Sequence, residues 1–254
     1  MEPLRITSND NPQFKRQQKA LQDRDFRRSE ALLWVEGPKV ISQLEPSRIE
    51  ALFATEGFDL PSFLSTCQPG SANIPTILLV EPLARRAFDT LNPQHVGALV
   101  RWNPVALDTL DAAKGLLILD GIQDPGNTGT LLRTAAGLGY GGAVIAGGAE
   151  PRGPKVVRAA AGAHFVLPIA EAKLDEIRAH LQAANIPAFL AEAHGTAGLP
   201  SSSKGPFALV VGSEAHGISP GWQGKPVTIP VTPGVESLNA AMAGGILMWR
   251  LKNG

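Results

Sequence analysis

The C-terminal half of the sequence alternates short, nearly uninterrupted apolar runs with segments of helical spacing. The apolar runs cover 115–120, 142–147, 164–169, 187–193, 207–212 and 227–231. The segments of helical spacing cover 127–138, 154–162, 173–184 and 237–251. Apolar strands that alternate with helices indicate a largely parallel sheet with both faces covered. We therefore predict an α/β domain over 115–254, with its ligand site at the carboxyl ends of the strands.

The N-terminal part shows a weaker form of the same alternation. Strand-like runs cover 31–37, 49–55, 74–81 and 96–102, and helical spacing covers 83–91. These runs predict a second, smaller α/β domain over 1–103. Residues 104–114 are more polar and lack a strong period, so we interpret them as a linker between the two domains.

Positive charge is concentrated in one short segment near the N-terminus. The whole chain has 23 Lys and Arg residues against 23 Asp and Glu residues, so its net charge indicates no partner. Within 11–28, the candidates for contact with a phosphate backbone are Lys15, Arg16, Lys19, Arg27 and Arg28. We interpret this segment either as a solvated helix face or as a phosphate-contacting arm.

The loop after the first strand of the C-terminal domain contains DPGN and leads into a helix. We expect Asn127 to cap this helix and Gly139 to close it. Arg133 lies six residues after Asn127. It either points along the sheet edge towards the loops or forms an ordinary surface pair with Asp124.

A second loop, VVGSEAHGIS at 210–219, also follows an apolar strand. Two glycines flank Ser213, Glu214 and His216, so backbone amides can approach a ligand closely. Walker spacing and the full GxGxxG fingerprint are absent, which argues against an ordinary nucleotide fold. The G-x-S-x-G elbow is also absent, and residues three apart in a tight loop rarely meet as nucleophile and base, so we do not favour a hydrolase.

A third loop, IPVTPGVESLN at 229–239, precedes the last helix. We expect Ser237 to cap that helix, whose many small residues permit close helix packing or a subunit interface. Pro233 and Gly234 predict a tight turn, and we expect a ligand close to it.

Several classes of protein are not favoured by the composition. The single cysteine, Cys67, excludes internal disulfides and a cysteine-rich zinc site. The histidines show no paired ligand spacing, so we expect no metal. The polar N-terminus lacks an apolar signal core, and no run approaches the length of a membrane span. We therefore expect a cytoplasmic protein that does not enter a membrane.

Taken in this order, the three loops resemble the three motifs of the SpoU family of RNA ribose 2′-O-methyltransferases, within the SPOUT superfamily. The matching segments are D-x3-DPGNTG-x3-RTA from Asp120, ALVVGSEAHGIS at 208–219, and Ile229-Pro230 with Ser237-Leu238-Asn239. The resemblance covers roughly 115–252. It differs from the family's common I-P-M-x-G in the third motif, because Gly234 stands one position later. The segments EGPKVISQL, ALFATEG and HVGALVRW more weakly resemble an L30e-like substrate-recognition domain.

The resemblance implies a C-terminal domain tied in a deep trefoil knot, which binds S-adenosylmethionine and works as a homodimer. Carried over by motif, the cofactor contacts would be Gly212, Ile229 and Leu238. The catalytic and site-shaping set would be Asn127, Arg133, Glu214, Ser237 and Asn239. In this set we expect Arg133 to orient the ribose 2′-hydroxyl and a nearby phosphate, and to assist loss of the hydroxyl proton.

Ribosomal RNA is the substrate that we expect, with transfer RNA second. Two further hypotheses stay open from the sequence. One is a knotted RNA-binding protein without catalysis, and the other is a nucleotide-dependent oxidoreductase, although the chain lacks that fold's glycine fingerprint. Cofactor binding discriminates between the three hypotheses. The methyltransferase requires S-adenosylmethionine, the oxidoreductase requires a nicotinamide cofactor, and the non-catalytic protein requires neither.

Overall fold

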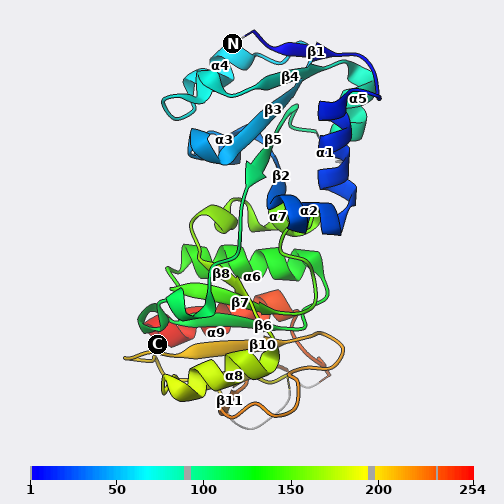
Figure 1. Cartoon of the computed structure of the whole chain (residues 1–254). Helices are drawn as coiled ribbons and strands as arrows, with labels where there is room; N and C mark the ends of the chain where they lie inside the picture. Colours follow the sequence, from blue (N-terminus) through cyan, green and yellow to red (C-terminus); the bar gives the residue numbers. More distant parts are fainter. Residues whose placement is uncertain (1, 89–92, 194–197, 233) are drawn as a thin grey trace. The chain divides into compact units, whose positions relative to one another are not determined.

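The computed structural model describes residues 2–88, 93–193, 198–232 and 234–254. The chain divides into two compact units (Figure 1). The N-terminal unit comprises Met1–Asn103 with Arg152–Arg158, and the C-terminal unit comprises Pro104–Pro151 with Ala159–Gly254. In the part of the chain that the structure describes, no helix has the length and apolar character needed to cross a bilayer.

The N-terminal unit is built on a five-stranded mixed sheet of strand order β1-β4-β3-β5-β2. Its strands are β1 (Leu4–Ile6), β2 (Leu32–Glu36), β3 (Ile49–Thr55), β4 (Thr76–Leu79) and β5 (Val96–Arg101). Its helices are α1 (Pro12–Gln22), α2 (Arg24–Glu30), α3 (Pro38–Ile41), α4 (Leu60–Ser65) and α5 (Glu81–Ala87). Phe14 of α1 and Ala84 of α5 pack with Trp34 and Phe53 of the sheet in one buried cluster. The four strands predicted in this region are confirmed.

The C-terminal unit contains a six-stranded parallel sheet of order β11-β9-β10-β6-β7-β8. Its strands are β6 (Leu116–Asp120), β7 (Gly142–Ala146), β8 (Ile169–Glu171), β9 (Ala188–Ala191), β10 (Ala208–Gly212) and β11 (Lys225–Val227). The helices in this half of the chain are α6 (Pro125–Gly137), α7 (Pro154–Ala160), α8 (Leu174–Ala183) and α9 (Ala240–Asn253). The predicted α/β class with a parallel sheet is confirmed.

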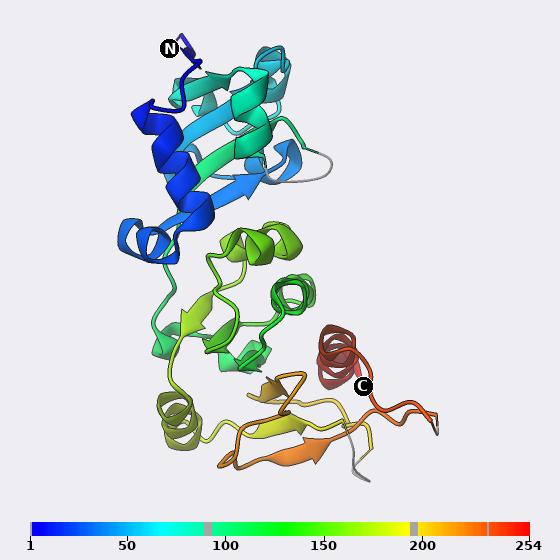
Figure 2. The ribbon, with the colours of Figure 1, turned by 90° about the vertical axis from the view of Figure 1, so that its right-hand side faces the viewer.

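Both faces of this sheet are covered by helices, as Figure 2 shows. On one face, Ile177 of α8 packs in the same core cluster as Val210 of β10. On the other face, α9 approaches α6 so closely at Gly244 that an added Cβ would lie 2.4 Å from Leu131 of α6 and 3.4 Å from Val211 of β10. Neighbouring residues of a strand point to opposite faces, so Val210 and Val211 anchor the two layers.

The strand predicted at 164–169 is wrong over most of its length. Gly162 has a φ of +93° and precedes a 3-10 turn, η5 (Ala163–Phe165). His164 is buried in that turn, where its Nε2 makes a hydrogen bond of 2.8 Å with the carbonyl of Pro151. The strand β8 begins only at Ile169. Apolar composition alone does not distinguish a buried turn from a strand.

The segment 104–114, predicted as a linker, clusters with the C-terminal unit instead. It forms the 3-10 helices η3 (Leu107–Thr109) and η4 (Ala112–Lys114), and it buries Leu110 in the core of that unit. The strand predicted at 227–231 is also wrong over most of its length, because β11 covers Lys225–Val227 and shares only Val227 with the prediction.

Two helices begin at residues other than those predicted. The cap of α6 is Asp124, whose Oδ1 accepts the N–H of Asn127 at 2.7 Å. The cap of α9 is Asn239, whose Oδ1 accepts the N–H groups of Ala241 and Met242. Asp and Asn are favoured caps, and proline is favoured directly after one. The predicted closing residue, Gly139, does follow α6 with a φ of +67°.

Candidate functional site

The parallel topology places three loops at one edge of the C-terminal sheet. Strand β10 pairs with β6 so that Gly212 lies opposite Asp120, and the first loop (121–124) and the second loop (213–222) leave these two residues. Asn127 lies in the first turn of α6, directly after the first loop. The third loop (228–239) follows β11, which pairs with β9, the other neighbour of β10. All three loops predicted to carry chemistry therefore start at the carboxyl edge, where ligands bind in such sheets.

The side chain of Asn127 links the three loops. Its Nδ2 donates to Glu214 Oε1 of the second loop at 2.6 Å, and its Oδ1 accepts from Nδ2 of Asn239, at the end of the third loop, at 2.9 Å. Asn239 also caps α9, so the network is continuous with a helix terminus. We call Asn127, Glu214 and Asn239 the Asn127 network. These three predicted site residues are brought together by the structure.

The second loop begins with a turn that requires glycine at its start. Ser213 and Gly217 exchange two backbone hydrogen bonds of 2.9 Å. A Cβ added to Gly212 would lie 2.2 Å from the carbonyl carbon of Gly217, which is closer than any side chain tolerates. The hydroxyl of Ser213 accepts the backbone N–H of His216 at 3.1 Å, a contact that shapes the turn and does not pair a nucleophile with an imidazole base.

Asp120 belongs to the site although no role was predicted for it. It ends β6, is almost fully buried, and accepts hydrogen bonds from Ser219 of the second loop. The signal available in the sequence was an aspartate that directly follows four apolar strand residues, where an unpaired carboxylate would be costly.

Arg133 is not part of the Asn127 network. It is exposed on α6, and among the residues that the structure describes it has neither a hydrogen-bond nor an ion-pair partner. Asp124, its alternative surface partner, instead caps α6. The Arg133 side chain is therefore available to a ligand from outside the chain.

The third loop offers a buried hydroxyl to a ligand. Thr228 is 5% exposed, and within the described part of the chain its Oγ1 has no hydrogen-bond partner. Ile229 and Leu238 are half-buried and Ser237 is exposed. Pro233, which the predicted tight turn includes, lies outside the described residues. The unsatisfied hydroxyl directly precedes Ile229 in the chain, so it is a polar group at a predicted cofactor residue that a ligand would satisfy.

Helices α6 and α9 form an exposed apolar groove beside the Asn127 network. The cavity has a volume of about 560 Å³. Its lining side chains include Asn127, Thr134, Met242, Ile246 and Trp249. Trp249 is 53% exposed, which is unusual for such a large apolar side chain and indicates a surface that binds another molecule.

The basic segment forms α1 and α2, and several of its cations have partners within the N-terminal unit. These partners are Asp10 for Lys15 (2.8 Å), Glu30 and Glu50 for Arg16 (2.8 Å each), and the Phe26 ring for Lys19 (5.7 Å to its centre). Arg27 is 5% exposed and donates to the carbonyls of Ala20 and Leu21. Its side chain therefore stabilises the helix pair, whereas Arg28 is exposed.

Among the described residues, no group of three or more His, Cys, Asp or Glu side chains is arranged to hold an ion.

Comparison with known proteins finds a matching family and similar methyltransferases. Residues 114–249, just over half of the chain, match the model of the SpoU rRNA Methylase family. A Bacillus subtilis protein named 23S rRNA (guanosine(2553)-2′-O)-methyltransferase is 28% identical over 232 residues, which cover 86% of this chain and 87% of that protein. A Synechocystis protein named as an uncharacterized tRNA/rRNA methyltransferase is 30% identical over 266 residues, which cover 97% and 93%.

A solved structure matches over almost the full length of both chains. The crystal structure of the SpoU methyltransferase AviRb from Streptomyces viridochromogenes, in complex with the cofactor AdoMet, has a TM-score of 0.80 and 25% identity. The match covers 95% of this chain and 97% of that one. The sequence and structural comparisons thus agree with the resemblance found in the three loops.

Proposed function

Because this chain belongs to the SpoU rRNA Methylase family, we propose that it transfers a methyl group from S-adenosylmethionine to a ribose 2′-hydroxyl of ribosomal RNA. The enzyme class, an S-adenosylmethionine-dependent RNA 2′-O-methyltransferase, follows from the family and from the relatives named for that reaction. The observation that supports the site most directly is the Asn127 network, which joins the three motif loops. The oxidoreductase and non-catalytic hypotheses are set aside.

Ribosomal RNA is the favoured substrate because the Bacillus subtilis relative is named for 23S rRNA. Transfer RNA is the alternative, since the Synechocystis relative is named for both classes.

Gly212, Ile229 and Leu238 are the residues that would hold the cofactor, and Thr228, which precedes Ile229 in the chain, adds a buried hydroxyl without a partner among the described residues. The cofactor supplies a methyl carbon activated by a positively charged sulfonium. Transfer to the ribose oxygen would break the carbon–sulfur bond and leave a neutral thioether, and the hydroxyl proton would pass to solvent water. Orientation contributes about 7–11 kcal/mol to such a step, whereas a general base contributes about 10²- to 10⁴-fold in rate. Alignment is therefore the larger task of the protein.

Arg133 is proposed to align the acceptor. Its exposed guanidinium presents several fixed donors, which suit a phosphate oxygen and the neighbouring 2′-hydroxyl. In this role it holds the hydroxyl in line with the methyl carbon and assists loss of the proton. Glu214, Asn239 and Ser237 shape the loops around this position, the first two through Asn127.

Homodimer formation through the groove between α6 and α9 is part of the proposal. The exposed Trp249, Met242 and Ile246 support it, because a second copy would remove them from water. A cytoplasmic location is also proposed, since the RNA substrate and the methyl donor are available there.

A deep trefoil knot in the C-terminal unit is proposed as well. It is supported by contacts of the segment after β9: Gly198 accepts the N–H of Thr228, Pro200 accepts from Arg250 Nε, and Ser203 donates to Leu251. The chain that precedes α9 and α9 itself thus both contact this segment. The mixed sheet of the N-terminal unit supports an L30e-like domain that binds the RNA substrate.

The experiment that tests this function is transfer of a labelled methyl group from S-adenosylmethionine to separated ribosomal and transfer RNA. The RNA is purified from cells that lack the gene, so that the target position is unmodified. We expect label on ribosomal RNA and an alkali-resistant linkage at the labelled nucleotide. Label on transfer RNA alone would show that transfer RNA, and not ribosomal RNA, is the substrate. Label on a base would overturn the proposed reaction.

A further inference from the structure

The second loop is fixed at both of its ends. Near its start, Glu214 accepts the hydrogen bond from Asn127. Near its end, Asp120 accepts three hydrogen bonds, from the backbone N–H and the hydroxyl of Ser219 (2.8 Å each) and from Nε1 of Trp222 (2.9 Å). Asp120 is only 2% exposed, so these donors replace the water that its carboxylate has lost.

Arg178 of α8 contacts the far end of the second loop at Pro220 and Trp222. Its guanidinium carbon lies 5.2 Å from the centre of the Trp222 ring, and its Nη2 donates to the carbonyl of Pro220 at 2.5 Å. Its Nη1 lies 3.3 Å from Oδ1 of Asp175, and the side chain is 23% exposed. One arginine therefore holds both the backbone and the aromatic side chain of the loop.

The loop backbone between these two contacts is shaped to receive the guanidinium. Gly221 has a φ of +93°, and a Cβ added there would lie 3.1 Å from Nη1 of Arg178. A side chain at this position would be strained and would press on the arginine.

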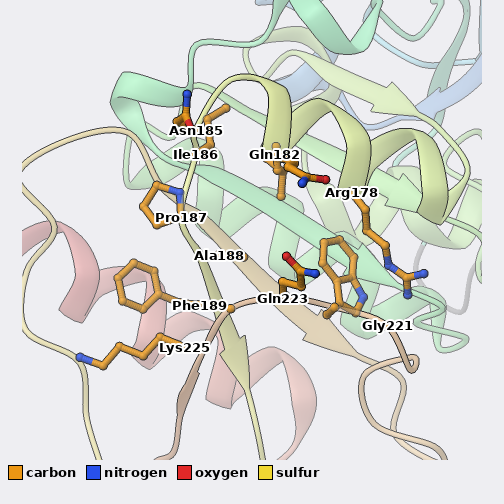
Figure 3. A pocket seen from close by; sticks show the side chains of 13 residues that line it. Arg178, Gln182, Asn185, Ile186, Pro187, Ala188, Phe189, Gly221, Gln223 and Lys225 are labelled. Atoms are coloured by element: carbon orange, nitrogen blue, oxygen red, sulfur yellow. The ribbon is translucent and has the colours of Figure 1, made fainter.

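A cavity of about 680 Å³ lies beside Arg178, between α8 and the segment 221–225 (Figure 3). Gln182 and Leu181 of α8 line it on one side, and Trp222 and Lys225 line it on the other. Because this space is open, the contacts of Arg178 are important for holding the segment to α8. Trp222 packs in addition against the apolar core of the unit.

We propose that Arg178 and Trp222 are positioning residues for the methyl transfer. With Asp120 they hold the far end of the second loop, and through the loop they keep Glu214 on Asn127 and the backbone after Gly212 in place for the cofactor. Neither residue lies in the three motif segments. The inference rests on the proposed function for its catalytic consequence, but the anchor itself is a property of the free protein.

The first measurement is hydrogen exchange of the backbone amides of 213–222 in the protein without ligands. Arg178→Ala should exchange faster in this loop than the wild type, with little change elsewhere. The matched control is Lys252→Ala. Lys252 also places a cation over a ring, 5.5 Å from the centre of Tyr140, and donates to a backbone carbonyl, that of Gly139, at 2.8 Å.

The second measurement is binding of S-adenosylmethionine by calorimetry, without RNA. If the loop is in its binding form only part of the time, the apparent Kd rises by the inverse of that fraction, and we expect about a five- to twentyfold rise for Arg178→Ala. Arg178→Lys should recover part of the loss, since it keeps a cation over the ring. Trp222→Phe keeps the ring but removes the donor to Asp120, and it should show an intermediate effect.

The kinetic signature separates positioning from a general loss of structure. We expect the KM for S-adenosylmethionine to rise in Arg178→Ala while kcat at saturation stays within about threefold, because the ligand itself restores the loop. Loop exchange and Kd equal to those of Lys252→Ala would overturn the proposal. An absence of methyl transfer in the wild type would instead contradict the proposed function, and loop exchange would still test the anchor.

Discussion

Asn127 makes two side-chain hydrogen bonds to different loops, so a change at this one residue reaches the whole proposed site. A hydrogen bond to a charged group contributes about 1.5–3 kcal/mol, and the partly solvated pair with Glu214 falls at the lower end. Asn127→Ala should therefore lower kcat/KM roughly tenfold or more. Asn127→Asp should lower it further, since it places a second carboxylate against Glu214.

The matched control for these variants is Asn253→Ala, which removes an amide that bonds only to the carbonyl of Trp249 within α9. Its kcat/KM should stay near that of the wild type. If Asn127→Asp matched Asn127→Ala in activity, the contact with Glu214 would not matter for catalysis.

Tyr140 is the single tyrosine of the chain, and it gives a clean test of burial at the residue scale. Burial raises the pKa of its phenol well above the ordinary value, and the hydroxyl donates to the carbonyl of Met248 at 3.0 Å. The unfolded chain ionises at about pH 10, whereas the folded chain keeps its proton. The free energy of unfolding should therefore fall as the pH rises above about 10.

Tyr140→Phe should remove the fall in the free energy of unfolding that ionisation of Tyr140 causes above about pH 10. At neutral pH, its free energy of unfolding should be lower than that of the wild type by about 0.5–1.5 kcal/mol, because the hydrogen bond is lost. Denaturant unfolding at several pH values measures both effects. In the wild type, the tyrosinate absorbance should appear together with unfolding. Ionisation near pH 10 in the folded protein would show that the side chain is accessible to water.

At the residue scale, the sequence identified the members of the Asn127 network but not how they interact. Asn127 was predicted as a helix cap, because an Asn after a Pro-Gly pair has that local signal. The neighbouring Asp124-Pro125 pair has a stronger one and takes the cap. The contacts of Asn127 with residues about 90 and 110 positions away depend on strand pairing, which no local pattern contains.

At the scale of elements, the basic segment of α1 and α2 contains exposed cations, the half-buried Arg16 and the buried Arg27. Arg28 is exposed at the end of α2, and Arg27 is buried beside it. If α2 contacts RNA, Arg28→Gln should reduce the slope of log affinity against log salt by roughly 0.7, the contribution of one phosphate contact to a single strand. Binding assays at several salt concentrations measure this slope.

Arg27→Gln is the matched comparison, because it also removes one positive charge from α2 but at a buried side chain. It should lower the thermal stability of the protein, since the carbonyls of Ala20 and Leu21 lose their donor. An unchanged slope in Arg28→Gln would favour the other interpretation of the sequence, that the segment is a solvated helix face.

Elements with a strong period were predicted well, and the irregular ones were not. β3 and β10 are found where apolar runs predicted them, because a buried strand needs such a run. Residues 164–169 are equally apolar but form a turn and a strand start, since Gly162 reverses the chain before the sheet. The 104–114 segment looked like a linker because 3-10 helices have too few residues to show a period.

At the scale of the whole molecule, the groove between α6 and α9 predicts the oligomeric state. Ile246→Glu should place a charge in the surface that the proposed homodimer would bury, and light scattering should then show the mass of one chain where the wild type shows two. The control is Leu4→Glu, at an apolar residue of the N-terminal unit that is 52% exposed, and its mass should equal that of the wild type. A wild type with the mass of one chain would contradict the proposed homodimer.

The most direct test of the proposed reaction compares Arg133→Ala with the wild type in methyl transfer to ribosomal RNA and in binding of S-adenosylmethionine. Lys225→Ala is the control, since it removes an exposed cation at the amino end of β11. Arg133→Ala should lose at least about 100-fold in transfer rate, while its Kd for the cofactor stays within about twofold. Transfer by Arg133→Ala at the rate of the wild type would contradict the proposed role of Arg133 in aligning the ribose hydroxyl.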